Sequence, residues 1–222
     1  MADRHVVRVK VWGPLACFTR PEMKVERVSY PVMTPSAARG ILEAILWKPE
    51  FHWCVRAIHV LKPIQFVSIR RNEVQKKIPT RTVKQWMKDP TKYKPFYADG
   101  VRTQRNTFAL GNVAYVIEAS VDLPEFSTTD PPVKYREMFE RRVDKGQCFQ
   151  RPYLGCREFA ADFGPPEETD CPIEESMDLG LMLYDIDYGK VNRPLFFTAK
   201  LHDGVLTIDR ETVRGLEEVA PT

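Results

Sequence analysis

The stretch MTPSAARGILEAILWKPEFH, residues 33–52, carries the signals of one helix together with its start and its end. Thr34 can cap the N-terminus, and Pro35 occupies the first helical position, where its missing N–H group costs nothing. Apolar side chains then recur at helical spacing on one face, at Ala38, Ile41, Leu42 and Ile45. Pro49 prevents continuation of the helix. The pattern therefore predicts an amphipathic helix with one buried face.

Gly40 lies inside this predicted helix, where it costs roughly 1 kcal/mol relative to alanine. Two explanations are open at this point. Either the helix packs closely on a sheet, or the backbone of a ligand approaches it closely.

Length and composition indicate a globular protein. The chain has 222 residues, enough for one large domain or for a medium and a small domain, and 43% of them are hydrophobic. No apolar run approaches the roughly 20 residues of a membrane span, and the first residues contain no apolar segment of a secretory signal. The five cysteines lack CxxC spacing, which argues against a disulfide framework and a zinc site. We therefore expect a cytoplasmic protein without a membrane partner.

The net charge of +3 hides a strong asymmetry. Residues 70–105 contain eleven Lys or Arg and three acidic residues, whereas residues 163–222 contain five Lys or Arg and thirteen acidic residues. A charge asymmetry of this size indicates that the two parts of the chain face different kinds of binding partner. The basic part suits a polyanion, and the acidic part suits a protein neighbour or solvent.

Alternation and turn signals predict the remaining elements. Strands are expected over residues 5–12, 53–61, 64–69 and 113–123, and Gly13-Pro14 is expected to end the first of them. A second helix should begin at Asp130-Pro131, with Gly146 just after its end, and a strand should end near Phe163. The order β-α-β, β-α-β is typical of an α+β, ferredoxin-like (RRM-like) domain over residues 1–165. Residues 166–222 are expected to form a small β-rich C-terminal module.

Residues 70–111 are interpreted as a basic insertion in the first domain. Prolines 79, 90 and 95 predict little regular structure there, apart from one short helix near residues 83–88. Four aromatic residues are interleaved with the cations: Trp86, Tyr93, Phe96 and Tyr97. A merely soluble surface is one interpretation, but the mixture of cations and aromatic rings favours nucleic-acid binding.

Common catalytic motifs are absent, because the chain has no Walker A sequence, no HExxH and no GxSxG. His59 lies on an apolar strand face and is expected to be a core histidine. Asp185 and Asp187 could hold a metal, although two acids in such a strand are more often a solvated face. We expect neither a metal nor a cofactor.

Several longer motifs together resemble the CRISPR-associated Cas family five, subtype I-C (Dvulg type), of the RAMP superfamily. They are Trp12-Gly13, CFTRPEMKVERVSY at 17–30, Trp47-Lys48-Pro49, Lys62-Pro63-Ile64, Arg71-Asn72-Glu73 and LGCREF at 154–159. The resemblance covers residues from about 5 to beyond 200. It implies a RAMP-type, ferredoxin-like domain and a protein that cleaves precursor CRISPR RNA in the repeat without a metal. It also implies that the protein stays on the 5′ handle within the type I-C interference complex.

The resemblance also indicates where catalysis would lie. The family assigns it to an aromatic residue or histidine just before Trp-Lys-Pro and to a Lys-His pair at the start of the second helix. The first position is Leu46 here, and the pair maps onto Val133-Lys134 or Lys134-Tyr135. The candidate catalytic residues are therefore Lys134, Tyr135 and His52.

The partners expected from this interpretation are CRISPR repeat RNA and the other subunits of the complex, with double-stranded DNA as a further candidate. The predicted RNA-binding residues are Arg20, Lys24, Arg39, Lys48, Arg70, Arg71, Lys76, Lys77 and Arg81. Two alternatives stay open: a binding subunit with little or no catalysis, and a general binder of duplex nucleic acid.

Overall fold

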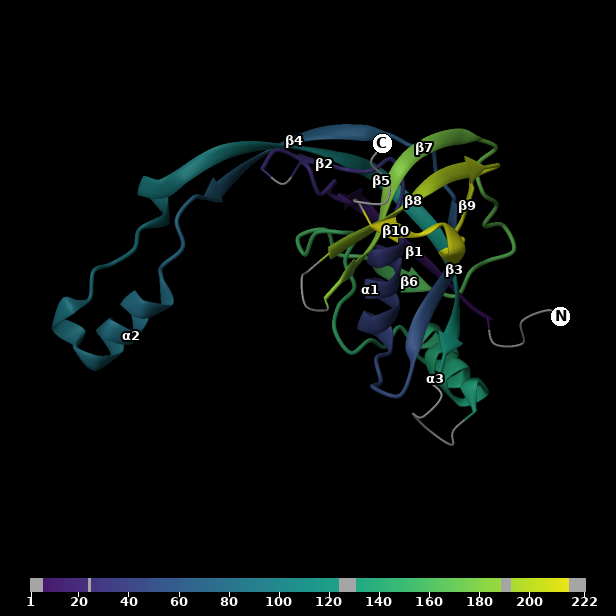
Figure 1. The fold of residues 1–222 in the computed structure, drawn as a ribbon, viewed down its shortest axis with the longest axis horizontal. Coiled ribbons are helices and arrows are strands. Elements are labelled where there is room, and N and C mark those ends of the chain that lie inside the picture. Colours follow the sequence, from purple (N-terminus) through teal and green to yellow (C-terminus); the bar gives the residue numbers. More distant parts are fainter. Residues whose placement is uncertain (1–5, 24, 124–130, 189–192, 216–222) are drawn as a thin grey trace.

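The computed structural model describes residues 6–23, 25–123, 131–188 and 193–215. A compact body carries a long arm that projects to one side (Figure 1). The strands are β1 (Val6–Ala16), β2 (Arg27–Val28), β3 (His52–Val60), β4 (Phe66–Val74), β5 (Arg102–Asp122), β6 (Asp162–Gly164), β7 (Met177–Asp187), β8 (Arg193–His202), β9 (Val205–Thr207) and β10 (Arg214–Gly215). The helices are α1 (Pro35–Ile45), α2 (Thr80–Lys88) and α3 (Pro132–Asp144), with short 3-10 turns at Pro90–Lys92, Ala98–Val101 and Arg210–Thr212.

Helix α1 forms where its start signal predicts, and it ends earlier than Pro49 requires. The Thr34 side chain accepts a hydrogen bond from the Ala37 N–H group at 3.3 Å. Leu46 already has an extended backbone, because other segments supply donors to the last carbonyls of the helix. The N–H groups of Phe149 and Gln150 donate to the Ala44 carbonyl at 2.8 and 3.1 Å. These contacts complete the helix end in place of further helical turns.

Antiparallel strands form the centre of the body, in the order β3-β5-β1-β6. The predicted alternation holds in β1, where Val7, Val9 and Val11 are at most 1% exposed. The strand continues past Gly13-Pro14 to Ala16, so the predicted end was wrong. Strand β6 pairs only with Lys10 to Trp12, and the missing N–H group of Pro14 therefore breaks no bond to β6.

A β-bulge between Val55 and Ala57 changes the alternation of β3. Ile58 becomes fully buried, and His59 turns toward the edge of the core. His59 Nε2 lies 3.5 Å from the Glu118 carboxylate, and the pKa of His59 is lowered by burial and by the nearby charge of Arg8. The prediction of one continuous apolar face was thus wrong beyond the bulge, because a bulge shifts the two-residue period by one.

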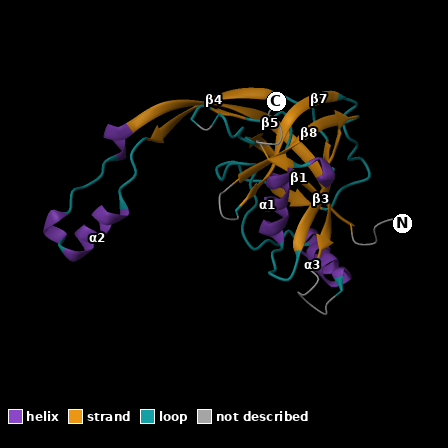
Figure 2. Ribbon diagram, viewed as in Figure 1, coloured by secondary structure: helices purple, strands orange, loops and turns teal. Residues whose placement is uncertain are grey.

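The arm is a continuous hairpin of β4 and β5, with α2 near its tip (Figure 2). The predicted helix is present and begins earlier, at Thr80. The expectation of little regular structure was wrong at both ends of the basic region, because residues 70–74 and 102–111 belong to strands. None of the residues of α2 is buried. The arm therefore owes its position to its base and not to packing at its tip.

The C-terminal strands extend the sheet of the body. In the described parts of the chain, ten strands make up one sheet, and β9 joins β3 through the pairing of Ile58 with Leu206, both fully buried. Strand β7 pairs with β8 and also contacts α1. The protein is thus a mixed α and β structure with a curled antiparallel sheet, and the division after residue 165 stays a prediction.

The loop at residues 154–159 crosses the start of the chain at close range. Gly155 has φ +83°, and a Cβ atom at this position would lie 2.1 Å from the Cys17 carbonyl oxygen. Only glycine fits both constraints. By contrast, a Cβ atom at Gly40 would meet nothing within 4 Å, so close packing on a sheet does not explain that glycine.

We predict opposite effects of alanine at these two glycines. Gly155→Ala should lower the free energy of unfolding by about 2 kcal/mol or more, because it adds a backbone clash to an unfavourable φ. Gly40→Ala should raise it by about 0.5–1 kcal/mol, because alanine favours the helix. Urea unfolding of both variants measures this difference. Equal destabilisation by the two substitutions would contradict the assignment of their roles.

Candidate nucleic-acid interface

The three candidate catalytic residues lie around one aromatic contact at the end of the body opposite the base of the arm. The rings of Phe51 and Tyr135 are 4.8 Å apart, and this contact brings the start of β3 next to the start of α3. His52 and Lys134 are the chain neighbours of those two rings, and both are exposed. The structure therefore places the chain segments that carry these residues next to each other, while the alternation of β3 turns the His52 side chain away from the face that carries Phe51 and Trp53.

Tyr135 differs from the other two because it is only 2% exposed. Its hydroxyl group is buried and has no hydrogen-bond partner among the described residues. Leu46 is also fully buried, and its carbonyl oxygen accepts a hydrogen bond from the Trp53 indole N–H at 2.9 Å. Position 46 is thus a core position in this chain. The catalytic roles of the three candidates stay predictions.

Exposed cations are concentrated on the arm. Arg70 is exposed on β4, and Lys76, Lys77 and Arg81 are exposed between β4 and the second turn of α2. Because the arm stands away from the body (Figure 1), the segment between β4 and α2 lies apart from β7, the C-terminal strand that carries acidic residues. The exposed cations of the arm form a surface that a phosphate backbone can reach.

The other predicted RNA-binding residues have varied surroundings. The Arg20 guanidinium lies 4.6 Å from the centre of the Tyr30 ring, and Lys48 is half-buried just after α1. Lys24 lies outside the described residues. Arg39 donates to both carboxylate oxygens of Asp185 at 2.9 Å and also to Glu43 at 2.7 Å. Arg39 therefore joins α1 to β7, and its contact in this structure is intramolecular.

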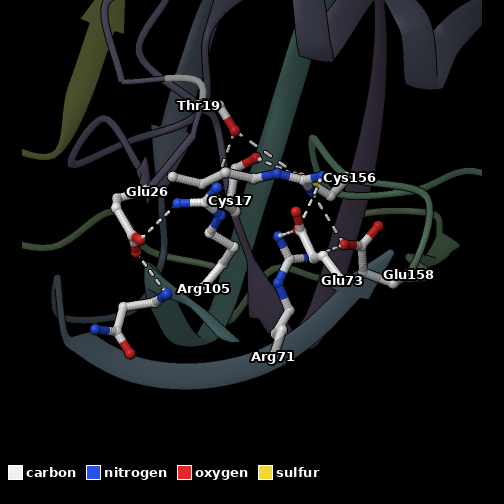
Figure 3. Close-up of polar contacts among 10 residues, drawn as sticks. Cys17, Thr19, Glu26, Arg71, Glu73, Arg105, Cys156 and Glu158 are labelled. Atoms are coloured by element: carbon white, nitrogen blue, oxygen red, sulfur yellow. Dashed lines mark hydrogen bonds and ion pairs between the residues drawn. The ribbon is translucent and has the colours of Figure 1, made fainter. Parts of the chain in front are cut away.

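Arg71 also makes intramolecular contacts. It belongs to an anchor cluster of two arginines and two glutamates at the base of the arm: Arg27, Arg71, Glu73 and Glu158. Figure 3 shows how Arg71, Glu73 and Glu158 point toward one another. Glu158 accepts hydrogen bonds from Arg71 and, at 3.1 Å, from Arg27. Glu73 lies 2.8 Å from Arg71 and 3.5 Å from Arg27. The cluster thus connects β2, β4 and the loop at 154–159.

Partial burial of Glu158 raises its pKa, but a backbone hydrogen bond and the charges of Arg71 and Arg27 outweigh this, and the net pKa is lowered. The carboxylate is therefore ionised at neutral pH. The motifs Arg71-Asn72-Glu73 and LGCREF supported the family resemblance in the sequence, but their mutual contact was not predicted. The only signal in the sequence for this contact was that one motif contains a cation, Arg71, and the other contains an anion, Glu158.

A sulfur site lies beside the anchor cluster. The Arg27 guanidinium donates to Cys156 Sγ at 3.3 Å, and Cys156 Sγ also lies 3.9 Å from the Thr19 hydroxyl group. A hydrogen bond from the Cys17 thiol and then the charge of Arg27 lower the pKa of Cys156, against the opposing effect of burial. The pKa of Cys17 is raised by the same hydrogen bond and by burial. The pKa values of the two thiols are therefore shifted in opposite directions, and Cys156 is the more acidic of the pair.

A cleft of about 330 Å³ opens between the start of α1, β7 and the loop at 154–159. Its wall contains Ser36, Arg39 and Gly40 of α1, Gly155 of the loop, and Leu183 and Asp185 of β7, together with residues that follow β1. The N-terminus of α1 contributes partial positive charge to this cleft. Gly40 lines this cleft and has open space at its Cβ position.

The described residues offer neither a metal-binding cluster nor a membrane-spanning helix. No group of three or more His, Cys, Asp or Glu side chains there is arranged to hold a metal ion. Asp185, which the sequence offered as a metal ligand, instead binds Arg39. No helix in the described ranges is long and apolar enough to cross a membrane.

Comparison with known proteins identifies the class as CRISPR-associated proteins. The family Cas_Cas5d, described as CRISPR-associated protein (Cas_Cas5), matches residues 6–209. A protein of Mannheimia succiniciproducens named "CRISPR pre-crRNA endoribonuclease Cas5d" is 48% identical, over 94% of this chain and 96% of its own length. A Thermus thermophilus protein of the same name is 43% identical, over 95% of this chain and 94% of its own length.

Solved structures agree at the level of the fold. One is titled as the crystal structure of a CRISPR-associated protein, with a TM-score of 0.67 and 23% identity, and covers 94% of this chain and 96% of its own. Another, a functionally uncharacterised protein from Streptococcus mutans, has a TM-score of 0.65 and 19% identity over the same shares of the two chains. The chain belongs to the Cas5d family, which confirms the resemblance seen in the sequence.

The sulfur site gives a prediction about pH. Because the pKa of Cys156 is lowered, its reactive thiolate persists at a more acidic pH than that of an ordinary cysteine. We expect iodoacetamide alkylation of Cys156 to have a more acidic midpoint than alkylation of Cys148 or Cys171, both exposed. Arg27→Gln should shift the Cys156 midpoint toward higher pH. Mass spectrometry of each cysteine peptide measures the midpoints, and identical midpoints for all three cysteines would refute the assignment.

Proposed function

We propose that this protein cleaves precursor CRISPR RNA within its repeat and stays bound to the 5′ handle as a subunit of a type I-C interference complex. Membership of the Cas5d family carries this proposal, because the match spans nearly the whole chain and the relatives named as endoribonucleases are 48% and 43% identical. The basic arm supplies a surface for the RNA. We expect this work to take place in the cytoplasm.

The chemistry that we propose needs no metal. A base removes the proton from a ribose 2′-OH group, whose oxygen attacks the adjacent phosphorus. The bond to the 5′-oxygen breaks, and an acid protonates this leaving group. Cations stabilise the charge on the phosphorane. The products are a 2′,3′-cyclic phosphate and a free 5′-hydroxyl group.

Lys134 is our first candidate for the cation. It is exposed in the first turn of α3, and the helix N-terminus adds partial positive charge at this place. His52 is our candidate for the base or the acid. It is exposed and follows Phe51, whose ring contacts Tyr135. Tyr135 can take part only if its buried hydroxyl group becomes accessible to RNA.

We also infer the ferredoxin-like (RRM-like) arrangement of RAMP proteins for the central part of the body. Strands β1, β3, β5 and β6 alternate with α1 and α3 in the order βαββαβ. Their antiparallel order β3-β5-β1-β6 is the order expected for that arrangement, with the arm inserted between β3 and the body half of β5. The acidic segment after residue 165 suits contact with another subunit of the complex more than contact with RNA.

One observation favours an alternative without catalysis. The family position just before Trp47 is a buried leucine, and the residue directly after Lys134 is Tyr135 where the family has a histidine. The protein would then cap the 5′ handle without cutting the repeat.

Incubation of the purified protein with its cognate repeat RNA in EDTA separates the two functions. Cleavage to a 2′,3′-cyclic phosphate supports the nuclease, and binding without cleavage supports the capping subunit. Equal binding of unrelated duplex DNA would instead indicate a general nucleic-acid binder.

We predict that Lys134→Ala slows EDTA-resistant cleavage at least tenfold, because a positioned general acid, base or cation contributes about 10²- to 10⁴-fold. Repeat binding should stay within a few-fold of the wild type. Lys145→Ala is the matched control, since Lys145 is exposed just after the other end of the same helix. Single-turnover rates and binding titrations measure both quantities. A Lys134→Ala rate equal to that of the control would place the site elsewhere.

A second prediction concerns phosphate contacts on the arm. Replacing Lys76 and Lys77 by Gln should weaken RNA binding and reduce the slope of log K against log salt by about 0.7 per lost contact. Replacing the exposed Lys145 and Lys200 by Gln, both on the body, changes the net charge equally and should leave the slope unchanged. Fluorescence anisotropy at four salt concentrations gives both slopes. Equal slopes for the two double variants would exclude the arm as the phosphate-binding surface.

A further inference from the structure

The two faces of the arm hairpin have different chemistry. Side chains alternate between faces along β4 and β5, and the register pairs Ser68 with Phe108 and Arg70 with Asn106. The inner face carries Arg71 and Glu73 of the anchor cluster. The outer face, as we call the opposite side, consists of Phe66, Ser68, Arg70, Asn72 and Val74 on β4 and of Arg102, Gln104, Asn106 and Phe108 on β5.

Two phenylalanines lie stacked on the outer face, close to the body. The ring centres of Phe66 and Phe108 are 4.7 Å apart with an angle of 4° between the ring planes. The two residues are 38% and 44% exposed. A water-exposed aromatic pair forgoes much of the stabilisation that burial of such large side chains provides. The nearly parallel rings form a flat apolar surface on an otherwise polar strand pair.

The rest of the outer face suits a polyanion. None of its nine residues is acidic, two are arginines, and Asn72, Gln104 and Asn106 provide amide donors and acceptors. Arg102 lies 2.6 Å from the exposed carboxylate of Asp99, which a phosphate would have to displace. The carboxylate of Glu26 lies at the edge of the hairpin, where it accepts from the Asn106 backbone N–H and lies 3.6 Å from Arg105. From body to tip, the outer face runs from the aromatic pair past Arg70 and Arg102 to Lys76 and Lys77.

We infer that the outer face of β4 and β5 is a binding site for unpaired RNA nucleotides. Bases stack on the rings of Phe66 and Phe108, and Arg70 and Arg102 hold phosphates toward the tip. Stacking requires bases whose flat faces are accessible, and these are found in single strands and not within a duplex. The inference deepens the proposed function, because it selects the single-stranded part of the repeat transcript as the occupant of this face.

The test compares two double variants in binding to a fluorescein-labelled 12-nucleotide oligouridine. Phe66→Leu with Phe108→Leu removes the aromatic rings and keeps apolar bulk. We expect this double variant to bind at least about fivefold more weakly, with an unchanged slope of log K against log salt concentration. Phe66→Tyr with Phe108→Tyr keeps the rings and should bind within twofold of the wild type. Phe149→Leu is the matched control, because Phe149 is exposed on the body.

A second measurement does not depend on the folding of a variant. Ultraviolet cross-linking of a 4-thiouridine oligonucleotide to the wild-type protein, followed by mass spectrometry, should label peptides that contain Phe66 or Phe108. Wild-type affinity of the leucine variant, or cross-links confined to the body, would overturn the inference. Loss of assembly with other complex subunits at unchanged RNA affinity would also overturn it and assign the face to a protein. Failure of the wild type to bind either the repeat or oligouridine would instead refute the proposed function itself.

Discussion

The Glu158 carboxylate accepts hydrogen bonds from Arg27 and Arg71, and it thereby ties the loop after Gly155 to the base of the arm (Figure 3). This contact depends on the close crossing at Gly155, because only a residue without a side chain lets the loop lie against Cys17. Partly exposed ion pairs contribute about 1 kcal/mol or less each. The anchor cluster therefore acts mainly by fixing the orientation of an arm that has no buried helix of its own.

The same arrangement separates the charges of the protein by function. Arg71 on the inner face is paired with Glu73 of its own strand and with Glu158 of the body. Arg102 on the outer face is paired with Asp99, whereas Arg70, Lys76 and Lys77 are exposed and available to a polyanion. Arg71 and Arg70 are adjacent in the chain, yet the alternation of a strand sends them to opposite faces with opposite surroundings. Strand β7, which carries Asp178, Asp185 and Asp187, lies on the body, away from the arm tip (Figure 1). A long RNA can therefore follow the arm toward its tip without approaching this acidic strand.

The region proposed for catalysis is built differently from the arm. Its exposed groups, His52 and Lys134, stand beside a buried aromatic contact that joins β3 to α3. Packing thus holds the ends of two elements together, and the helix N-terminus contributes partial charge. Leu46 belongs to that packing and not to the exposed groups. Any chemistry at this end of the body must use side chains that differ from the pattern expected for the family.

The sequence by itself determined the local elements: the start of α1, the alternation of β1, the helix on the arm and the family. These features depend on neighbours a few residues apart, where spacing and caps are informative. Only the tertiary structure decided that Arg71 binds Glu158, 87 positions away, and that Arg39 binds Asp185, 146 positions away. It also decided the bulge near Val55 and the buried place of Tyr135. The physical reason is that a charge or a ring in a sequence has many possible partners, and folding selects one of them through the sheet register and the close crossing at Gly155.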